Sequence, residues 1–260
     1  MDDSEEVESY ASAAAAQHLD AIDNTFVEHL LRLLPPQKAT EPQSHREAIV
    51  KKTRERGLGR QETWALADPA WGLDVGTGPA QMAIKILARI PRLKFIGLDR
   101  SRTMLGSARR NAEGAGVSER LTLLVGDGHS LPFPDHAFAM VISNSVLHHA
   151  RAPVELLREL FRVAHPGAPV LVRDLRRPAR PLLRWHLWRH GRRYQGLMRQ
   201  LFNDSVRAAY TLDELQGFLD QAHLPDARVF RFHGAHIGIE RPEHREQGIG
   251  NREQKTTERR

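Results

Sequence analysis

Short, almost wholly apolar segments alternate with helical patterns from residue 71 to about residue 240. The pattern predicts a strand ending at Asp74, strands over 93–98, 121–125, 139–143 and 170–172, and helices over about 79–90, 101–113 and 153–164. Apolar strands of this kind are typical of a parallel sheet covered by helices on both faces. Two further apolar segments, 229–232 and 236–239, predict a terminal hairpin through Gly234 that adds an antiparallel edge. The fold class is therefore α/β.

Composition excludes several kinds of protein. The chain has 260 residues, 40% of them hydrophobic, which is enough to bury a full core. No apolar run approaches the ~18 residues that span a membrane. The absence of cysteine excludes disulfides, cysteine-ligated zinc and thiol catalysis, and we predict no metal site. The first ten residues hold five acids and no base, the wrong sign for a secretory signal or transit peptide, so we expect a cytoplasmic protein.

The chain divides into segments of different character. Residues 1–36 predict an acidic lead-in and one amphipathic helix, which Pro35-Pro36 ends and which we expect to pack on or over the ligand site. Residues 37–70 are a polar insert or linker, and residues 71–240 form the main domain. Residues 241–260 are polar, and we expect a disordered tail.

A glycine turn joins the first predicted strand to the first helix of the main domain. Gly76 and Gly78 follow Asp74 directly at the end of the apolar segment. Glycine tolerates positive φ and has no Cβ, so a glycine turn at a helix N-terminus exposes amide groups to a ligand. The turn predicts a close approach between backbone and ligand.

Three acids stand at or near the carboxyl ends of three consecutive strands: Asp74, Asp99 and Asp127. In open α/β sheets, ligands bind at this edge. Asp99 follows Asp74 at about the spacing of an acid that binds ribose hydroxyls. Asp127 would meet an exocyclic amine. These positions predict an adenosine-type ligand.

Residues of the same turn distinguish a dinucleotide ligand from a methyl donor. Gln81 stands where the dinucleotide fingerprint requires a third glycine. Asp74 would repel a pyrophosphate and would attract an ammonium group, directly or through water. A ligand with an α-amino group, a ribose and an adenine fits, so the predicted cofactor is S-adenosyl-L-methionine.

Four motifs then carry a resemblance to a known family. They are Asp74-Val75-Gly76-Thr77-Gly78, Gly97-Leu98-Asp99-Arg100-Ser101, Gly126-Asp127-Gly128-His129-Ser130-Leu131-Pro132-Phe133 and Ser143-Asn144-Ser145-Val146-Leu147-His148-His149. In this order they resemble the motifs of class I S-adenosylmethionine-dependent methyltransferases, nearest to the ubiquinone/menaquinone-biosynthesis branch. The resemblance covers roughly residues 71–175. It implies a Rossmann-like, seven-stranded, mostly parallel sheet with helices on both faces and an antiparallel last strand. Ala139-Met140 departs from the family, which often has an acid there.

The resemblance also implies a role for each cofactor-binding residue. Asp74, Gly76 and Gly78 would line the methionine side, Asp99 would hold the ribose, Arg100, Ser101 and Met104 would flank the ribose and adenine, Asp127 and Gly128 would face the adenine edge, and Asn144 would lie beside the sulfonium.

His148 and His149 are the candidate catalytic residues. Either imidazole would act as a base for a hydroxyl substrate near the transferred methyl. The structural alternative is that one packs under the helix beginning at Pro153 and the other is solvated.

An arginine-rich segment follows the fifth strand. Between Arg173 and Arg199 the chain has nine arginines and one acid, so this segment carries +8 in a chain whose net charge is +6. Residues 176–210 correspond to the family's substrate lid. The basic face is either solvated or a contact for an acidic or lipid-like small molecule, a membrane surface or RNA.

The predicted function is S-adenosylmethionine-dependent methyl transfer to a small or medium organic acceptor. Two alternatives stay open: an RNA methyltransferase that uses the arginine-rich segment, and a non-catalytic sensor or assembly protein that binds the cofactor.

Overall fold

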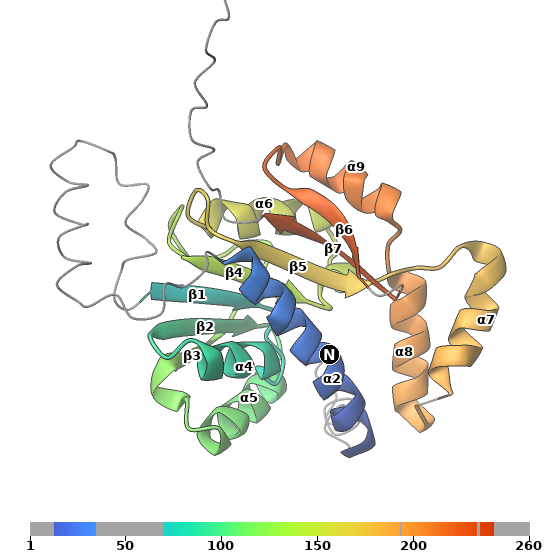
Figure 1. Ribbon diagram of the computed structural model, residues 1–260, viewed down its shortest axis with the longest axis horizontal. Coiled ribbons are helices and arrows are strands. Elements are labelled where there is room, and N and C mark those ends of the chain that lie inside the picture. The colour runs from blue at the N-terminus through green and yellow to red at the C-terminus, as the bar shows by residue number, and fades with distance from the viewer. Residues whose placement is uncertain (1–12, 35–69, 193, 233–234, 242–260) are drawn as a thin grey trace, which may run out of the picture.

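A seven-stranded sheet forms the centre of the computed structural model, which describes residues 13–34, 70–192, 194–232 and 235–241 (Figure 1). The strands are β1 Ala70–Val75, β2 Leu93–Asp99, β3 Leu121–Val125, β4 Met140–Asn144, β5 Val170–Leu175, β6 Arg228–Phe232 and β7 His236–Arg241. Their order is β3-β2-β1-β4-β5-β7-β6. The first five are parallel, and β7 runs antiparallel to β5 and β6. This confirms the predicted fold class and the antiparallel last strand.

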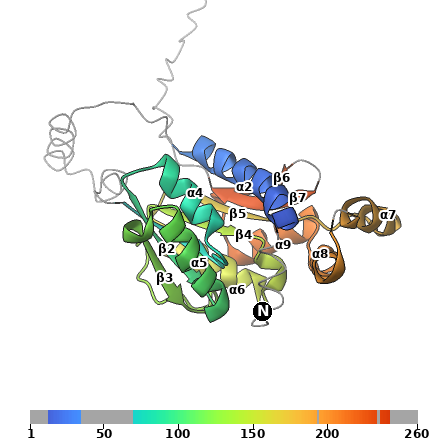
Figure 2. The same cartoon turned by 90° about the horizontal axis from the view of Figure 1, so that it is seen from below.

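Helices cover both faces of the sheet. They are α2 Ala13–Leu33, α4 Gln81–Arg89, α5 Arg102–Gly114, α6 Pro153–Val163, α7 Arg180–Gly191, α8 Gly196–Ala208 and α9 Leu212–Ala222, with 3-10 turns at Ser118–Arg120 and Leu147–His149. Figure 2 shows α2 and α4 on one side of the sheet and α6 on the other. Side chains alternate along β5 accordingly, because Val170 and Val172 join the core under α6 while Leu171 joins the core under α4.

Local signals set most element boundaries. The Ser101 side chain caps α5 by accepting from the Met104 amide at 3.2 Å. Thr211 and Glu214 form a reciprocal capping box at the start of α9. Pro153 occupies the first turn of α6, where its missing N–H costs nothing.

Two strand ends lie more than one residue from the sequence prediction. β5 continues to Leu175, three residues past the predicted end, because β7 pairs with it as far as Leu175↔His236. Arg241 pairs with Val170, so β7 takes the first residue of the predicted tail. The predicted linker 37–70 lies outside the described residues except for Ala70. The acidic lead-in before Ala13, the turn at Gly234 and residues 242–260 also lie outside them.

The buried side chain of Arg173 links α2 to β5 through hydrogen bonds. The Arg173 guanidinium donates to the Thr25 hydroxyl at 2.9 Å and to the Ile22 carbonyl at 3.1 Å. It also lies 4.9 Å from the centre of the Phe26 ring, a cation–π distance. Burial lowers the pKa of Arg173 to about 10, which leaves it charged near neutral pH. Burial raises the pKa of the neighbouring Asp23 to about 6.

Among residues 13–34, 70–192, 194–232 and 235–241, no helix combines the length and apolar character that a membrane span requires.

Candidate active site at the carboxyl ends of the strands

One cavity of about 1020 Å³ lies at the carboxyl edge of the parallel strands. Every candidate residue named from the sequence lines it: Asp74, Gly76, Gly78, Asp99, Arg100, Ser101, Met104, Asp127, Gly128, Asn144, His148 and His149. These residues come from the ends of four strands, because parallel strands deliver their carboxyl ends to one edge. The volume is at the upper end for ligand sites, so the cavity can hold a nucleoside-sized donor beside a second small molecule.

The glycine turn presents bare backbone to this cavity. Gly76 has φ +73°, and a Cβ there would lie 2.3 Å from a Val146 methyl carbon. Gly78 has φ +52°, and a Cβ there would meet no protein atom within 4 Å. Gly76 is therefore required by packing, whereas the backbone at Gly78 borders open space where a ligand can approach.

Asp74 is buried beneath this turn. Its carboxylate is part of a residue only 2% exposed and accepts a hydrogen bond from the Thr77 hydroxyl at 2.8 Å. Burial raises the pKa of Asp74 to about 7, and the nearby charge of Asp99 adds to the rise, while the Thr77 bond opposes it. Asp74 therefore gains or loses its charge near neutral pH.

The raised pKa of Asp74 gives a testable pH dependence of stability. Between the unfolded value near 3.8 and the folded value near 7, the folded protein holds a proton that the unfolded chain releases. The contribution of Asp74 to the free energy of unfolding therefore falls as pH rises through this window, by about 2 kcal/mol between pH 5.5 and pH 8. Urea unfolding at the two pH values measures it. We expect Asp74→Asn to lose this part of the pH dependence and Asp220→Asn, an exposed control, to keep it. Equal slopes in the wild type and Asp74→Asn would contradict the assignment.

Asp99 ties the glycine turn to the start of α5. One carboxylate oxygen accepts from the Gly78 amide at 2.7 Å and the other accepts from the Ser101 amide at 2.9 Å. Each carboxylate oxygen can accept a second hydrogen bond. The half-buried Asp99 thus holds the turn in place and keeps acceptor capacity toward the cavity.

Asp127 follows β3 at the far side of the cavity. One of its oxygens accepts from the His129 amide at 3.0 Å and contacts His129 Nδ1 at 2.7 Å. These hydrogen bonds, the backbone bond first, lower the pKa of Asp127 and keep it ionised. At the adjacent Gly128 a Cβ would lie 2.8 Å from Leu156, so a larger residue does not fit without a shift.

A buried histidine–aspartate pair lies near the ends of β4 and β5. His148 stands in the turn after β4, and its amide donates to Asp174 at 2.9 Å. His148 Nδ1 lies 2.6 Å from the other carboxylate oxygen of Asp174. The two side chains are only 2% and 3% exposed. His148 Nε2 is buried and has no hydrogen-bond partner among the residues that the structure describes. The ring lines the cavity, and one of its nitrogens is therefore not committed to another described residue.

His149 differs sharply from its neighbour. Its ring centre lies 3.9 Å from that of His148, and the residue is exposed at the cavity rim. Loss of water around the ring, followed by the influence of His148, lowers the pKa of His149. The contact of His148 with Asp174 was not expected from either interpretation of the two histidines.

Sequence reasoning did not assign several residues of this site a role. Asp174 was noted only as the single acid of the arginine-rich segment. The signal that could have found it is the same one that found Asp99 and Asp127, an acid at or just past a strand end, because Asp174 lies two residues past the predicted end. The rest of the lining includes Ile22 of α2, His186 and His190 of α7, Met198 and Phe202 of α8, and Tyr194 between these two helices.

Asn144 is oriented by a contact from outside the motif. Its side-chain oxygen accepts from Arg173 Nε at 3.1 Å. Because Arg173 also holds α2, the asparagine at the end of β4 and the N-terminal helix share one buried anchor.

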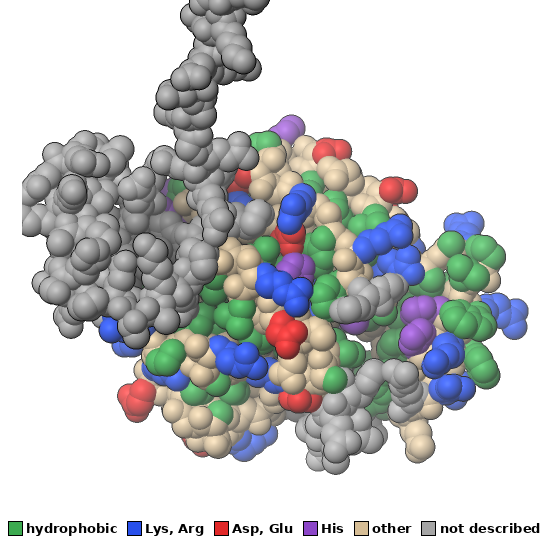
Figure 3. Space-filling model, viewed as in Figure 1, with side chains coloured by type: hydrophobic (Ala, Val, Ile, Leu, Met, Phe, Trp, Pro, Cys, Tyr) green, Lys and Arg blue, Asp and Glu red, His purple; other side chains and the backbone are tan. Residues whose placement is uncertain are grey.

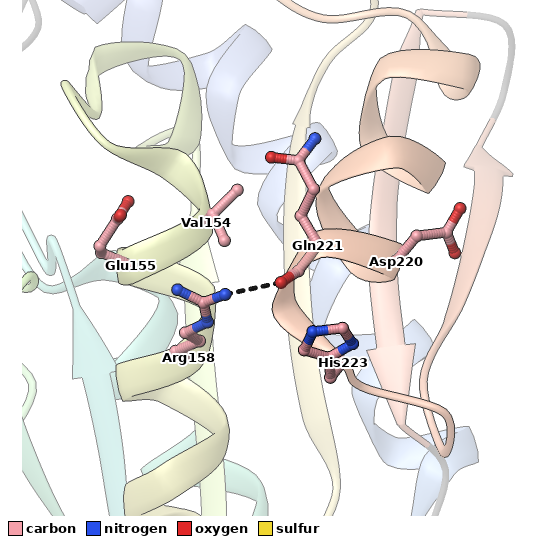
Figure 4. A pocket seen from close by; sticks show the side chains of 6 residues that line it. All are labelled: Val154, Glu155, Arg158, Asp220, Gln221 and His223. Carbon is pink, nitrogen blue, oxygen red and sulfur yellow. Dashed lines mark hydrogen bonds between the residues drawn. The ribbon is translucent and has the colours of Figure 1, made fainter.

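A second hollow, of about 690 Å³, lies between α6 and α9 (Figure 4). Arg158 donates there to the Gln221 carbonyl at 2.6 Å. Most of its lining side chains are exposed, and it shares no lining residue with the first cavity. We assign it no function.

Comparisons with known proteins agree with this geometry. A family model described as "Methyltransferase domain" matches residues 73–172. The ubiquinone/menaquinone biosynthesis C-methyltransferase UbiE of Cereibacter sphaeroides is 26% identical over 155 residues, 59% of this chain and 62% of that protein. A demethylmenaquinone methyltransferase of Roseiflexus castenholzii is 29% identical over 174 residues, 66% of this chain and 67% of that protein. The chain thus matches less than two thirds of the first relative's length.

A solved structure supports the fold. The SAM-dependent methyltransferase of Aquifex aeolicus superposes with a TM-score of 0.50 at 19% identity, covering 77% of this chain and 98% of that chain. The sheet order, the glycine turn and the family match over residues 73–172 are those expected of a class I S-adenosylmethionine-dependent methyltransferase domain, which confirms the resemblance seen in the four motifs. The two relatives carry the names of ubiquinone/menaquinone-type methyltransferases, the branch that the motifs resemble.

Proposed function

We propose that this protein transfers a methyl group from S-adenosylmethionine to a small, lipid-like organic acceptor. The observation that carries the proposal is that one cavity joins two different sites. The glycine turn and Asp99 line this cavity, and so does His148, whose buried Nε2 has no hydrogen-bond partner among the described residues. A donor site alone would serve a binding protein, whereas a buried base beside it serves a reaction.

The residues present fit the cofactor. Gly78 leaves room for a ligand against the backbone, and Asp99 is a carboxylate at the position of a ribose-binding acid. Ionised Asp127 suits an amine donor at the adenine edge. When bound, S-adenosylmethionine supplies an activated methyl group on a positively charged sulfur. The roles of Gly76, Arg100, Ser101, Met104, Gly128 and Asn144 toward this cofactor are part of the same proposal.

Apolar groups line the acceptor side of the cavity. Leu175 ends β5 there, and Tyr194, Met198 and Phe202 come from α8 and the residues before it. These side chains suit a flat aromatic or hydrocarbon-bearing molecule. One relative is named as a methyltransferase of ubiquinone/menaquinone biosynthesis and another as a demethylmenaquinone methyltransferase. We infer a quinone-like acceptor, with residues 176–210 as the lid that excludes water from it.

His148 is the proposed base. The contact between Nδ1 and Asp174 is best satisfied when Nδ1 carries a proton and donates it to the carboxylate. Nε2 then has a lone pair and accepts the proton of an acceptor hydroxyl. Deprotonation raises the electron density on the oxygen and on the conjugated ring carbons, where a methyl group would be attached. Asp174 orients the ring and stabilises the imidazolium that forms.

The function is tested by offering the full chain labelled S-adenosylmethionine with three acceptors: a reduced quinone that lacks a ring methyl, a short RNA, and no acceptor. We expect label on the quinol only, detected by mass spectrometry. Label on RNA alone would favour an RNA methyltransferase. Tight cofactor binding with no methylated product would favour a sensor or assembly protein. The cytoplasmic location stays a prediction.

A further inference from the structure

Exposed apolar side chains gather on one helix. Of the four large apolar side chains that are exposed in the described part of the chain, three stand on α7. Leu182, Trp185 and Trp188 are 57%, 58% and 57% exposed, against 42% for Val125, the fourth. Figure 3 shows hydrophobic, basic and histidine side chains crowded together over α7 at the right of the molecule. Soluble surfaces seldom group apolar side chains in this way without a contact partner.

The two faces of α7 have different tasks. His186 and His190 line the cavity, so they belong to the inner face. Leu182, Trp185 and Trp188 follow one another at intervals of three, which keeps them within one arc of the helix surface. α7 packs against α8 and is the outermost element at that edge in both Figure 1 and Figure 2. The exposed arc therefore faces away from the domain.

Positive charge surrounds this apolar arc. The sequence has no Asp or Glu between Asp174 and Asp204, a stretch that includes all of α7. Arg180 and Arg184 are exposed and form no ion pair with an acid among the residues that the structure describes. The Arg192 guanidinium lies 5.5 Å from the centre of the Trp188 ring. Tryptophan and leucine flanked by unpaired arginine is the composition of a helix that lies in a membrane interface.

We propose that α7 docks this protein on an anionic lipid bilayer, with Leu182, Trp185 and Trp188 inserted at the headgroup boundary and Arg180 and Arg184 at the lipid phosphates. This inference goes beyond the proposed function and does not depend on it, since vesicle binding requires no methyl transfer. Its consequence for the site is geometric. The helix that touches the bilayer with one face forms the cavity wall with His186 and His190 on the other, so a lipid-like molecule has a short path into the cavity.

The apolar arc distinguishes lipid from RNA as the partner. Arginines alone would suit phosphates of either kind. RNA-binding surfaces use aromatic side chains as stacking platforms for bases, and an exposed leucine between them offers no such platform. Insertion into a bilayer uses Leu182 and both tryptophans in the same way, by burying apolar area.

The test is flotation of the full chain with phosphatidylcholine vesicles, with and without phosphatidylglycerol. We expect binding to the anionic vesicles only, accompanied by a blue shift of tryptophan emission. Trp185→Ala/Trp188→Ala should weaken binding at least about tenfold because the inserted apolar area is lost. Arg180→Gln/Arg184→Gln should weaken it about thirtyfold, at roughly fivefold for each arginine near an anionic surface. The matched control Arg102→Gln/Arg109→Gln removes the same charge from exposed positions of α5 and should bind as the wild type does.

Three results would overturn the proposal. The first is no flotation with anionic vesicles, and the second is equal loss of binding in the α5 control, which would indicate net charge alone. The third is binding of polyuridylate that depends on Arg180 and Arg184 while vesicle binding is absent. Circular dichroism and cofactor binding of each variant show whether it is folded, and the exposed positions make folding the expected outcome. Failure of methyl transfer with intact vesicle binding would refute the proposed function and leave this inference standing.

Discussion

Replacing Asp99 with alanine is expected to raise the dissociation constant for S-adenosylmethionine about a hundredfold or more. Two charge-assisted hydrogen bonds to ribose hydroxyls would be lost, at roughly 1.5–3 kcal/mol each. The Gly78 and Ser101 amides would also lose the acceptor that holds the turn, which adds to the effect. Isothermal titration calorimetry measures the change.

Two further variants give this prediction an intermediate affinity and a control. Asp99→Asn keeps one side-chain oxygen as an acceptor, so its affinity should lie between those of the wild type and Asp99→Ala. Asp213→Ala removes an exposed acid on α9, outside the cavity lining, and should leave the affinity unchanged. Wild-type affinity in a folded Asp99→Ala protein would remove Asp99 from the cofactor site and, with it, the reason for reading the glycine turn as a donor site.

Replacing His148 with alanine is expected to lower the turnover number for the quinol acceptor by about 10²–10⁴, the usual contribution of a positioned general base. Cofactor affinity should change little, because the predicted contacts to the donor come from other residues. His149→Ala is the matched control, since this neighbour is exposed at the rim and has no carboxylate partner in the described structure. Stopped-time assays with saturating donor separate turnover from binding.

Asp174→Asn tests whether the His148–Asp174 pair, and not His148 alone, contributes to turnover. The asparagine retains an oxygen acceptor but not the charge that stabilises an imidazolium, so the turnover number should fall by less than in His148→Ala. Turnover near that of the wild type in a folded His148→Ala protein would exclude His148 as the base.

Much of the fold was readable because its signals are local. The Ser101 cap, the Thr211–Glu214 capping box and the turn at Gly76 each depend on residues within a few positions of one another. The end of β5 was not readable, because it is set by pairing with β7, more than sixty residues later. Asp174 was missed although it lies as close to the predicted end of its strand as Asp127 does to the end of β3.

The sequence alone predicted the donor half of the proposed site. Asp74, the two glycines and Asp99 indicate it through order and spacing, since one βαβ unit brings consecutive strand ends together whatever surrounds it. Only the tertiary structure brought together the residues of the proposed acceptor half. The sheet order places β4 beside β5, which brings His148 into contact with Asp174. The buried Arg173 binds α2, which comes from the N-terminal part of the chain. The tertiary structure also decided which face of α7 meets the cavity and which is exposed, because that depends on what packs against the helix and not on its own residues.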